Sequence, residues 1–374
     1  MDFRCGMKEE EIKGVIEMTQ EELTQLNVGQ NLDDLMNLDP RGYGVCRILY
    51  DASRKQAKEP LTMHAAKELI RVVKEGDLVY IFTGFVLIPS HCAETDGIIG
   101  AMLLARALVK AFNAKPVIIC PEDNLPAVRS MSCIIGLHLY DTIEEMEKFP
   151  VSMAVIPFTK DKAKAEAQAA EILAAGLPSA AVTIETAGAN SLGVYHNSIG
   201  KDITALQAKS EALFYKLQEN GVPIISIGDL GNEMGLGTLG EHLDTYIPYA
   251  GVGNCSCGCG GGLKVATKAD CVITATVSNW GCDGMMAALA YLKKDINIFQ
   301  DAELEKEAIL TAVKSGMVNM DGWLTPAVDG FDLKMNVLIV ELMRECVAYA
   351  LDYTRFAPGK VWFSKVLERG FYKR

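Results

Sequence analysis

Short apolar runs alternate with longer segments of helical composition along most of this chain. The runs rich in β-branched and aromatic residues predict strands at 78–82, 116–120, 152–156, 179–184, 222–227 and 270–277. The segments of helical composition are 100–108, 160–175, 203–220, 283–292 and 333–351. Such alternation is typical of βαβ units, so we expect a layered α-β-α fold of the α/β class with a mainly parallel or mixed sheet.

The first 60 residues differ from this pattern because they are polar and helical in composition. Periodic apolar positions over 12–26 predict a helix, whereas 27–43 is rich in turn-forming residues and predicts a surface loop. We therefore divide the chain into a helical N-terminal addition, 1–60, and a single α/β domain, 61–374.

Composition and charge exclude several classes of protein. Hydrophobic residues make up 49% of the 374 positions, enough to bury a sizeable core. The 48 acidic against 36 basic side chains give a net charge of −12, which disfavours nucleic acid or an anionic membrane as a partner. No apolar run approaches the ~18–20 residues that span a bilayer. The acidic amino terminus lacks a signal-like stretch, so we expect a cytoplasmic protein whose 11 cysteines are reduced.

Several predicted strands end in loops rich in Gly, Asp, Glu and Asn, and ligands of parallel sheets bind at such strand ends. The first loop leads from Thr83-Gly84 to Glu94-Thr95-Asp96-Gly97, where Thr95 or Asp96 is expected to cap the following helix. The second begins at Glu185 and contains Asn190 and Tyr195-His196-Asn197. A polar loop of about seventeen residues inside a compact domain is more often functional than idle.

The third loop is the most informative of the set. In Gly228-Asp229-Leu230-Gly231-Asn232-Glu233, continuing through Gly235 and Gly237, glycines alternate with carboxylate and amide side chains directly after an apolar strand. Glycines allow close backbone approach, and these oxygens suit a hard divalent cation. No lysine follows, so the loop is not a phosphate loop. A fourth loop, with Ser278 and Asn279, closes the predicted strand at 270–277.

These motifs, in this order, resemble those of the D-glutamate cyclase family. The resemblance covers roughly residues 60–300 and rests on Glu94-Thr95-Asp96-Gly97, Tyr195-His196-Asn197, the third loop and Ser278-Asn279-Trp280-Gly281. The family's catalytic unit is the C-terminal part of a vertebrate mitochondrial protein and is often free-standing in microbes. The resemblance implies a compact α/β fold, cyclising dehydration of D-glutamate to 5-oxo-D-proline, and a divalent cation in the acidic site. Within the motifs, Leu230 and Ile98 replace a glycine and a proline that are usual in the family.

Elementary chemistry also calls for a cation in such a site. The α-amine must lose its proton and the γ-carboxylate must be neutralised before the amine can attack. Glu94, Asp96, Asp229, Glu233 and the substrate are all acidic, so burying them together without a cation would be repulsive. Mg²⁺, Mn²⁺ or Ca²⁺ would relieve this repulsion and polarise the γ-carboxyl group. We expect the helix N-terminus after Asp96 and the third loop to hold the substrate's α-carboxylate.

These considerations assign a role to each candidate residue. Glu94, Asp96, Asp229 and Glu233 are assigned as catalytic groups and metal ligands. His196 is assigned as a proton shuttle, with a structural hydrogen-bonding role as the alternative. No nucleotide cofactor is expected. The expected substrate-binding residues are Thr83, Gly84, Thr95, Gly97, Glu185, Asn190, Tyr195, Asn197, Asn232, Ser278 and Asn279.

A second unusual feature is a glycine-rich stretch with three cysteines at alternate positions, Cys255, Cys257 and Cys259. The spacing differs from the CxxC of structural zinc sites, and side chains two residues apart tend to diverge. We favour a flexible, solvent-facing loop with incidental thiols. The alternative is a second metal site for Zn²⁺ or a metal cluster, with Cys271 or Cys282 as the fourth ligand.

The leading hypothesis is therefore a metal-assisted lyase that acts on D-glutamate or a close amino-acid relative. A metal-dependent hydrolase of a small amide or lactam would use the same acidic site. A non-catalytic metal- or amino-acid-binding protein, with the 255–259 loop as its sensor, is the alternative from another class. The expected partner is a small amino acid, and a homo-oligomer is compatible with the sequence.

Overall fold

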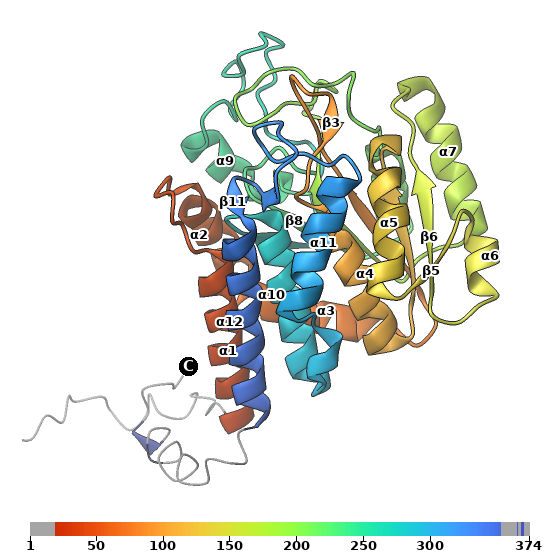
Figure 1. The fold of residues 1–374 in the computed structure, drawn as a ribbon. Helices are drawn as coiled ribbons and strands as arrows, with labels where there is room; N and C mark the ends of the chain where they lie inside the picture. The colour runs from red at the N-terminus through yellow and green to blue at the C-terminus, as the bar shows by residue number, and fades with distance from the viewer. Residues whose placement is uncertain (1–18, 353–364, 366–367, 370–374) are drawn as a thin grey trace, which may run out of the picture.

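The computed structural model of the chain describes residues 19–352, 365 and 368–369. A single sheet forms the middle layer of this part (Figure 1). Its strands are β1 Leu78–Gly84, β4 Lys115–Cys120, β5 His138–Tyr140, β6 Ser152–Pro157, β7 Ala180–Thr186, β8 Ile224–Gly228 and β9 Cys271–Thr274. They are all parallel, in the order β5-β6-β4-β1-β7-β8-β9. The expected α/β class with a mainly parallel sheet is confirmed.

Helices cover both faces of the sheet, because successive strand side chains point to opposite sides. On β1, Val79 and Ile81 enter one core, and Tyr80 and Phe82 enter the other. The first core is covered by α3 Leu61–Val72, α4 Ile98–Phe112, α5 Leu125–Ile135 and α10 Ser278–Lys293, with α1 Gln20–Met36, α11 Ala302–Lys314 and α12 Leu333–Leu351 packed outside them. The second is covered by α2 Val45–Ala57, α6 Ile143–Glu147, α7 Lys162–Ala175, α8 Glu211–Glu219 and α9 Gly240–Tyr246.

Two short hairpins complete the described part. They pair β2 Val86–Leu87 with β3 Cys92–Ala93, and β10 Ala327–Val328 with β11 Phe331–Asp332. The expected helix at 333–351 is confirmed as α12. None of the helices in the described part is long and apolar enough to cross a membrane.

The surface loop predicted for residues 27–43 is wrong over most of its length, because α1 continues to Met36. Val28, Leu32 and Met36 lie on one face of this helix and are buried against α3, α10 and α12. Gly29 belongs to this contact, since a Cβ there would lie 2.8 Å from Cβ of Pro60. Tertiary packing therefore overrides the turn preference of the sequence. The start of the predicted helix, 12–18, lies outside the described residues.

The helix predicted for 203–220 is wrong in its first half, since α8 covers only Glu211–Glu219. The preceding segment is held by side chains that satisfy backbone groups in place of a helix. Asp202 accepts a hydrogen bond from the backbone N–H of Thr204 (2.8 Å), and Gln207 bonds both backbone groups of Val86 (3.1 and 2.7 Å). Asp202 thus forms a local turn.

A buried carboxylate joins the first three helices. Asp33 of α1 accepts hydrogen bonds from the backbone N–H groups of Leu61 (2.7 Å) and Thr62 (3.1 Å), which begin α3. It also accepts bonds from the hydroxyls of Thr62 (2.7 Å) and of Tyr50 on α2 (2.8 Å). Asp33 therefore caps α3 from a distant helix and ties residues 19–57 to the α/β core. The proposed domain division at residue 60 stays a prediction.

We expect Asp33→Ala to lower the free energy of unfolding by about 2–3 kcal/mol, because the buried N–H groups that begin α3 lose their hydrogen-bond acceptor. Urea denaturation followed by circular dichroism measures this change. The neighbouring Asp34 is exposed, so Asp34→Ala should stay within about 0.5 kcal/mol of the parent protein. Equal effects of the two substitutions would contradict the capping role.

Candidate active site

The order of strands changes direction between β1 and β7. After β1 the chain builds the β4, β6 and β5 side of the sheet, and it then returns to place β7 on the other side of β1. The loops after these two strands diverge and leave a crevice, which is where ligands of open α/β sheets bind. A cavity of about 140 Å³ lies there. Its lining includes the carboxylates of Glu94, Asp96, Glu185, Asp229 and Asp329, with apolar walls from Phe85, Val86, Leu87, Ile88, Ile203, Leu230 and Met320.

A β-bulge turns Glu185 toward this cavity. Thr83 pairs with Ile184 and Gly84 pairs with Thr186, so Glu185 is the extra residue on β7. Its φ of +42° lies in the left-handed region, which costs a non-glycine residue about 1 kcal/mol. Gly97 makes this arrangement possible, because a Cβ at that position would lie 2.7 Å from Cβ of Glu185.

The N-termini of α4 and α10, which pack side by side on one face of the sheet, cap each other. The carboxylate of Asp96, just before α4, accepts hydrogen bonds from the backbone N–H groups of Ser278 (3.0 Å) and Asn279 (2.8 Å), which begin α10. In return, Oδ1 of Asn279 accepts from the backbone N–H groups of Gly97 (2.9 Å) and Gly100 (3.0 Å) of α4. The expectation that Thr95 or Asp96 caps α4 is therefore wrong, because the cap comes from Asn279.

Glu233 closes the loop after β8 in a similar way. Its buried carboxylate accepts hydrogen bonds from the backbone N–H groups of Asp229 (2.8 Å), Leu230 (2.7 Å) and Gly231 (2.6 Å). These N–H groups, like those of Gly97, Gly100, Ser278 and Asn279 at the two helix starts, are bound to protein oxygens and are not available to a substrate. The expectation that the start of α4 and this loop hold a substrate carboxylate stays a prediction.

Three carboxylates are close enough to share one metal ion. Oxygens of Asp96, Glu185 and Asp229 lie within 4.8 Å of one another. The side chain of Glu185 accepts a hydrogen bond from the hydroxyl of Ser278 (2.6 Å) through Oε2, which leaves its second oxygen available. Of the four predicted metal ligands, the structure therefore groups Asp96 and Asp229 with Glu185. Glu94 lines the same cavity outside that group, and Glu233 is turned to its own loop.

Burial and mutual repulsion raise the pKa values of these groups. Burial raises the pKa of Glu94, Glu185 and Asp229 well above the usual range, and neighbouring carboxylates add to the effect. Burial and the charge of Asp329 raise the pKa of Asp96 to about 7, against the lowering effect of its backbone hydrogen bonds. Near neutral pH the cluster therefore holds protons unless a cation replaces them.

Asp329 is a cavity residue that the sequence analysis missed. It lies in the β10–β11 turn, and its carboxylate forms an ion pair with Arg41 (2.9 Å). Burial raises the pKa of Asp329 to about 6, and Arg41 opposes this shift. Asp329 does not follow a strand of the main sheet, and Arg41 lies in the segment predicted as a surface loop. The strand-end pattern could therefore not indicate either residue.

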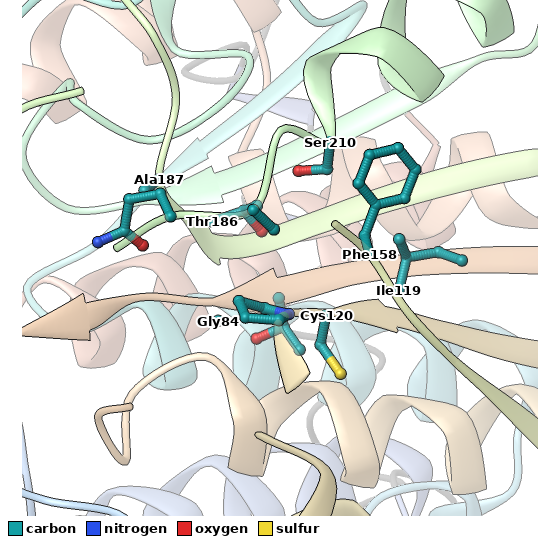
Figure 2. Close-up of a pocket in the computed structure, with 11 residues that line it drawn as sticks. Gly84, Ile119, Cys120, Phe158, Thr186, Ala187 and Ser210 are labelled. Carbon is teal, nitrogen blue, oxygen red and sulfur yellow. The ribbon is translucent and has the colours of Figure 1, made fainter. Parts of the chain in front are cut away.

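Several predicted substrate-binding residues lie away from the cavity. Thr83 and Gly84 line a closed pocket that has no room for a water molecule. Figure 2 shows Gly84 at the end of β1 beside Cys120, with Thr186 of β7 above it. Thr95 donates a hydrogen bond to the carbonyl of Ala327 (2.7 Å), and the Tyr195 hydroxyl donates to Glu211. These side chains support the loops around the cavity.

The remaining candidates fall into two groups. Asn197 and Asn232 line the acidic cavity. His196 lies apart, because its Nε2 is 3.2 Å from the Sγ of Cys257 and 3.5 Å from that of Cys259. Asn190 donates to the carbonyl of Gly262 (2.7 Å) and so supports the cysteine loop. In the alternative interpretation as a second metal site, the fourth ligand was wrong: Cys271 in β9 and Cys282 in α10 are outside the cluster, and His196 stands there instead.

Comparison with known proteins agrees with the motifs. A family model described as "D-glutamate cyclase-like, C-terminal" matches residues 32–344. The human protein named "D-glutamate cyclase, mitochondrial" is 26% identical over 274 residues. This alignment covers 70% of the present chain but only 39% of the human protein.

We expect the metal-free protein to lose stability as pH rises from about 5 to about 8. The folded-state pKa of Asp96 is about 7 and that of Asp329 about 6, against 3.8 for a free side chain. Over this window the folded state binds more protons than the unfolded state, so the free energy of unfolding falls. Thermal unfolding after chelation should show Tm lower by about 3 °C or more at the higher pH.

Adding Mn²⁺ or Mg²⁺ should raise Tm more at about pH 8 than at about pH 5, because protons compete with the ion for carboxylates. Asp283 and Glu305, buried acids bridged by Gln300, also have raised pKa values but lie outside the metal-binding group. Their contribution to the pH dependence should therefore persist with the ion present. A cation effect independent of pH would contradict the carboxylate site.

Proposed function

Since this chain belongs to the D-glutamate cyclase-like family, we propose that it is a lyase that converts D-glutamate to 5-oxo-D-proline and water. In this reaction the α-nitrogen forms a bond to the carbon of the γ-carboxyl group, and one oxygen of that group leaves as water. The observation that carries the proposal is the carboxylate-lined cavity at the β1–β7 crevice, which has the size for a small amino acid. The name of the human relative supports the same reaction.

The cavity offers acid and base groups in one small volume. A deprotonated carboxylate can accept a proton from the substrate ammonium and leave the amine free to attack. A carboxyl group that stays protonated near neutral pH can donate to the departing γ-oxygen. Asp229 suits either role, because it lines the cavity and because burial, neighbouring carboxylates and a side-chain hydrogen bond with Glu233 raise its pKa. Asn197 and Asn232 add amide groups that can orient the substrate.

The donor set of the cavity fits a hard divalent cation. Asp96, Glu185 and Asp229 would hold the ion through oxygen atoms, the ligands that Mg²⁺, Mn²⁺ and Ca²⁺ prefer. When bound, such an ion supplies Lewis-acid polarisation of the γ-carboxyl group. No basic side chain is among the described residues that line the cavity, although Arg41 contacts two of them, Asp329 and Met320. An anionic substrate therefore depends on a cation or on carboxyl protons for its binding energy.

The apolar wall of the cavity suits the hydrocarbon part of the substrate. Phe85, Val86, Ile203, Leu230 and Met320 face the acidic side of the cavity. The two methylene groups of glutamate can pack on this wall while both ends of the molecule reach polar groups. Bending the chain toward a five-membered ring brings the amine and the carbon of the γ-carboxyl group together, so a small cavity also favours the reactive conformation.

We expect Asp229→Asn to reduce formation of 5-oxoproline from D-glutamate by at least about 100-fold with little change in Tm. The assay is mass spectrometry of the product from D- and L-glutamate, with Mg²⁺, Mn²⁺ or Ca²⁺ and after chelation. Asp51→Asn, an exposed change on α2, is the matched control and should retain full activity. Unchanged turnover in Asp229→Asn would refute this assignment, and hydrolysis of small amides without cyclisation would favour the hydrolase.

We expect Glu185→Gln to weaken Mn²⁺ binding at least about tenfold, because the site loses one of its anionic ligands. The same change should stabilise the metal-free protein at neutral pH by about 1 kcal/mol, because glutamine does not have to be protonated to be buried and keeps an acceptor for Ser278. Calorimetric titration and thermal unfolding measure the two effects. Glu171→Gln, on the exposed face of α7, should change neither.

A further inference from the structure

Four metal-ligating side chains converge next to the acidic cavity, where the proposed reaction does not use them. Nε2 of His196 and the Sγ atoms of Cys255, Cys257 and Cys259 all lie within 4.8 Å of one another. The sulfurs of Cys255 and Cys259 are 3.4 Å apart, and those of Cys255 and Cys257 are 3.6 Å apart. His196 comes from the loop between β7 and α8, and the cysteines come from the loop between α9 and β9.

These separations are those of a tetrahedral ligand shell. Zinc–sulfur bonds of about 2.3 Å and zinc–nitrogen bonds of about 2.0 Å at tetrahedral angles place sulfurs about 3.8 Å apart and nitrogen about 3.5 Å from sulfur. The observed sulfur–sulfur distances are 3.4 and 3.6 Å, and the nitrogen–sulfur distances are 3.2 and 3.5 Å. All four atoms lie within 4.8 Å of one another, so the set suits one ion.

The backbone around the cluster holds the ligands in place. The N–H of Cys257 donates to the carbonyl of Gly200 (3.0 Å), and the hydroxyl of Ser256 donates to the carbonyl of Ile199 (2.7 Å). The N–H of Gly261 and the amide of Asn190 both point at the sulfur of Cys259 (3.4 and 3.5 Å). Two donors aimed at one sulfur suit a thiolate, the form that binds a metal.

We propose that His196, Cys255, Cys257 and Cys259 bind one zinc-class ion. Thiolate and imidazole ligands select a soft or borderline metal, in contrast to the oxygen ligands of the acidic cavity. Four protein ligands close the coordination shell, so the ion is structural and joins the two loops. Cys257 is exposed and gives the ion a path from solvent, whereas His196 is 1% exposed and anchors the other side.

The ion would also fix one wall of the acidic cavity. Asn197, which follows His196 directly, lines that cavity. The carbonyl of His196 accepts a hydrogen bond from the amide of Asn232 (2.9 Å), another lining residue. Loss of the ion would therefore loosen two substrate-facing amides while leaving the carboxylates in place. Formation of the site does not depend on the proposed reaction.

The test is metal analysis of the full-length protein, purified under reducing conditions with a trace of ZnCl₂. We expect about one zinc per chain, retained after treatment with a weak chelator. Replacement by Co²⁺ should give the visible d–d bands of tetrahedral coordination and thiolate charge-transfer bands. Cys257→Ser should lower zinc affinity at least about 100-fold, whereas Cys133→Ser, an exposed cysteine on α5, should leave it unchanged.

Three results would overturn the inference. The first is wild-type protein without zinc after this purification, and the second is a Cys255–Cys259 disulfide in the reduced preparation. The third is a Co²⁺ spectrum without thiolate bands, a measurement on the wild type that does not require any variant to fold. Asp229→Asn should keep its zinc, so zinc-loaded protein that forms no 5-oxoproline would refute the proposed function and leave this site intact.

Discussion

The reciprocal capping of α4 and α10 is the interaction on which the rest of the site depends. Two helices begin side by side at the carboxyl ends of β1 and β9, and each would otherwise leave backbone N–H groups buried without partners. Asp96 satisfies those of α10, and Asn279 satisfies those of α4. This exchange fixes the loop that carries Glu94 and brings Ser278 to the carboxylate of Glu185. The positions of the cavity carboxylates thus follow from how two helix ends are satisfied.

Internal capping also determines the electrostatic character of the cavity. Helix N-termini and glycine-rich loops commonly bind anions, but here several of their N–H groups are bound to Asp96, Asn279 and Glu233. What faces the cavity is then a surplus of carboxylates, offset on one side by Arg41. Burial makes this surplus costly, and raised pKa values are the response of a site without a cation. The net charge of −12 is therefore partly concentrated where a divalent ion would lower the free energy of the folded state.

The sequence predicted the sheet and the strand-end carboxylates because both are local features. Apolar runs mark buried strands, and Glu185 and Asp229 come at the end of such runs or directly after them, whereas Glu94 and Asp96 lie further along the loop that follows β1. It could not predict which carboxylates face a ligand and which accept hydrogen bonds from the backbone. The partners of Asp96 lie about 180 residues away in the sequence, and those of Glu233 depend on how its own loop turns. Asp329 and Arg41 were missed since they meet through tertiary packing. The helical continuation of α1 has the same origin, in burial of Val28, Leu32 and Met36.

Two chemically different donor sets lie on neighbouring segments of one loop system. The acidic cavity presents only oxygen, whereas the cluster around His196 presents sulfur and nitrogen. Hard ions discriminate strongly against thiolates, and soft ions gain little from carboxylates, so the two sets would not compete for one metal. They are joined mechanically by the hydrogen bond between Asn232 and the carbonyl of His196. The cluster around His196 can thus hold the loops that also line the acidic cavity. The cavity carboxylates are then not needed to hold these loops and can change their protonation during a reaction.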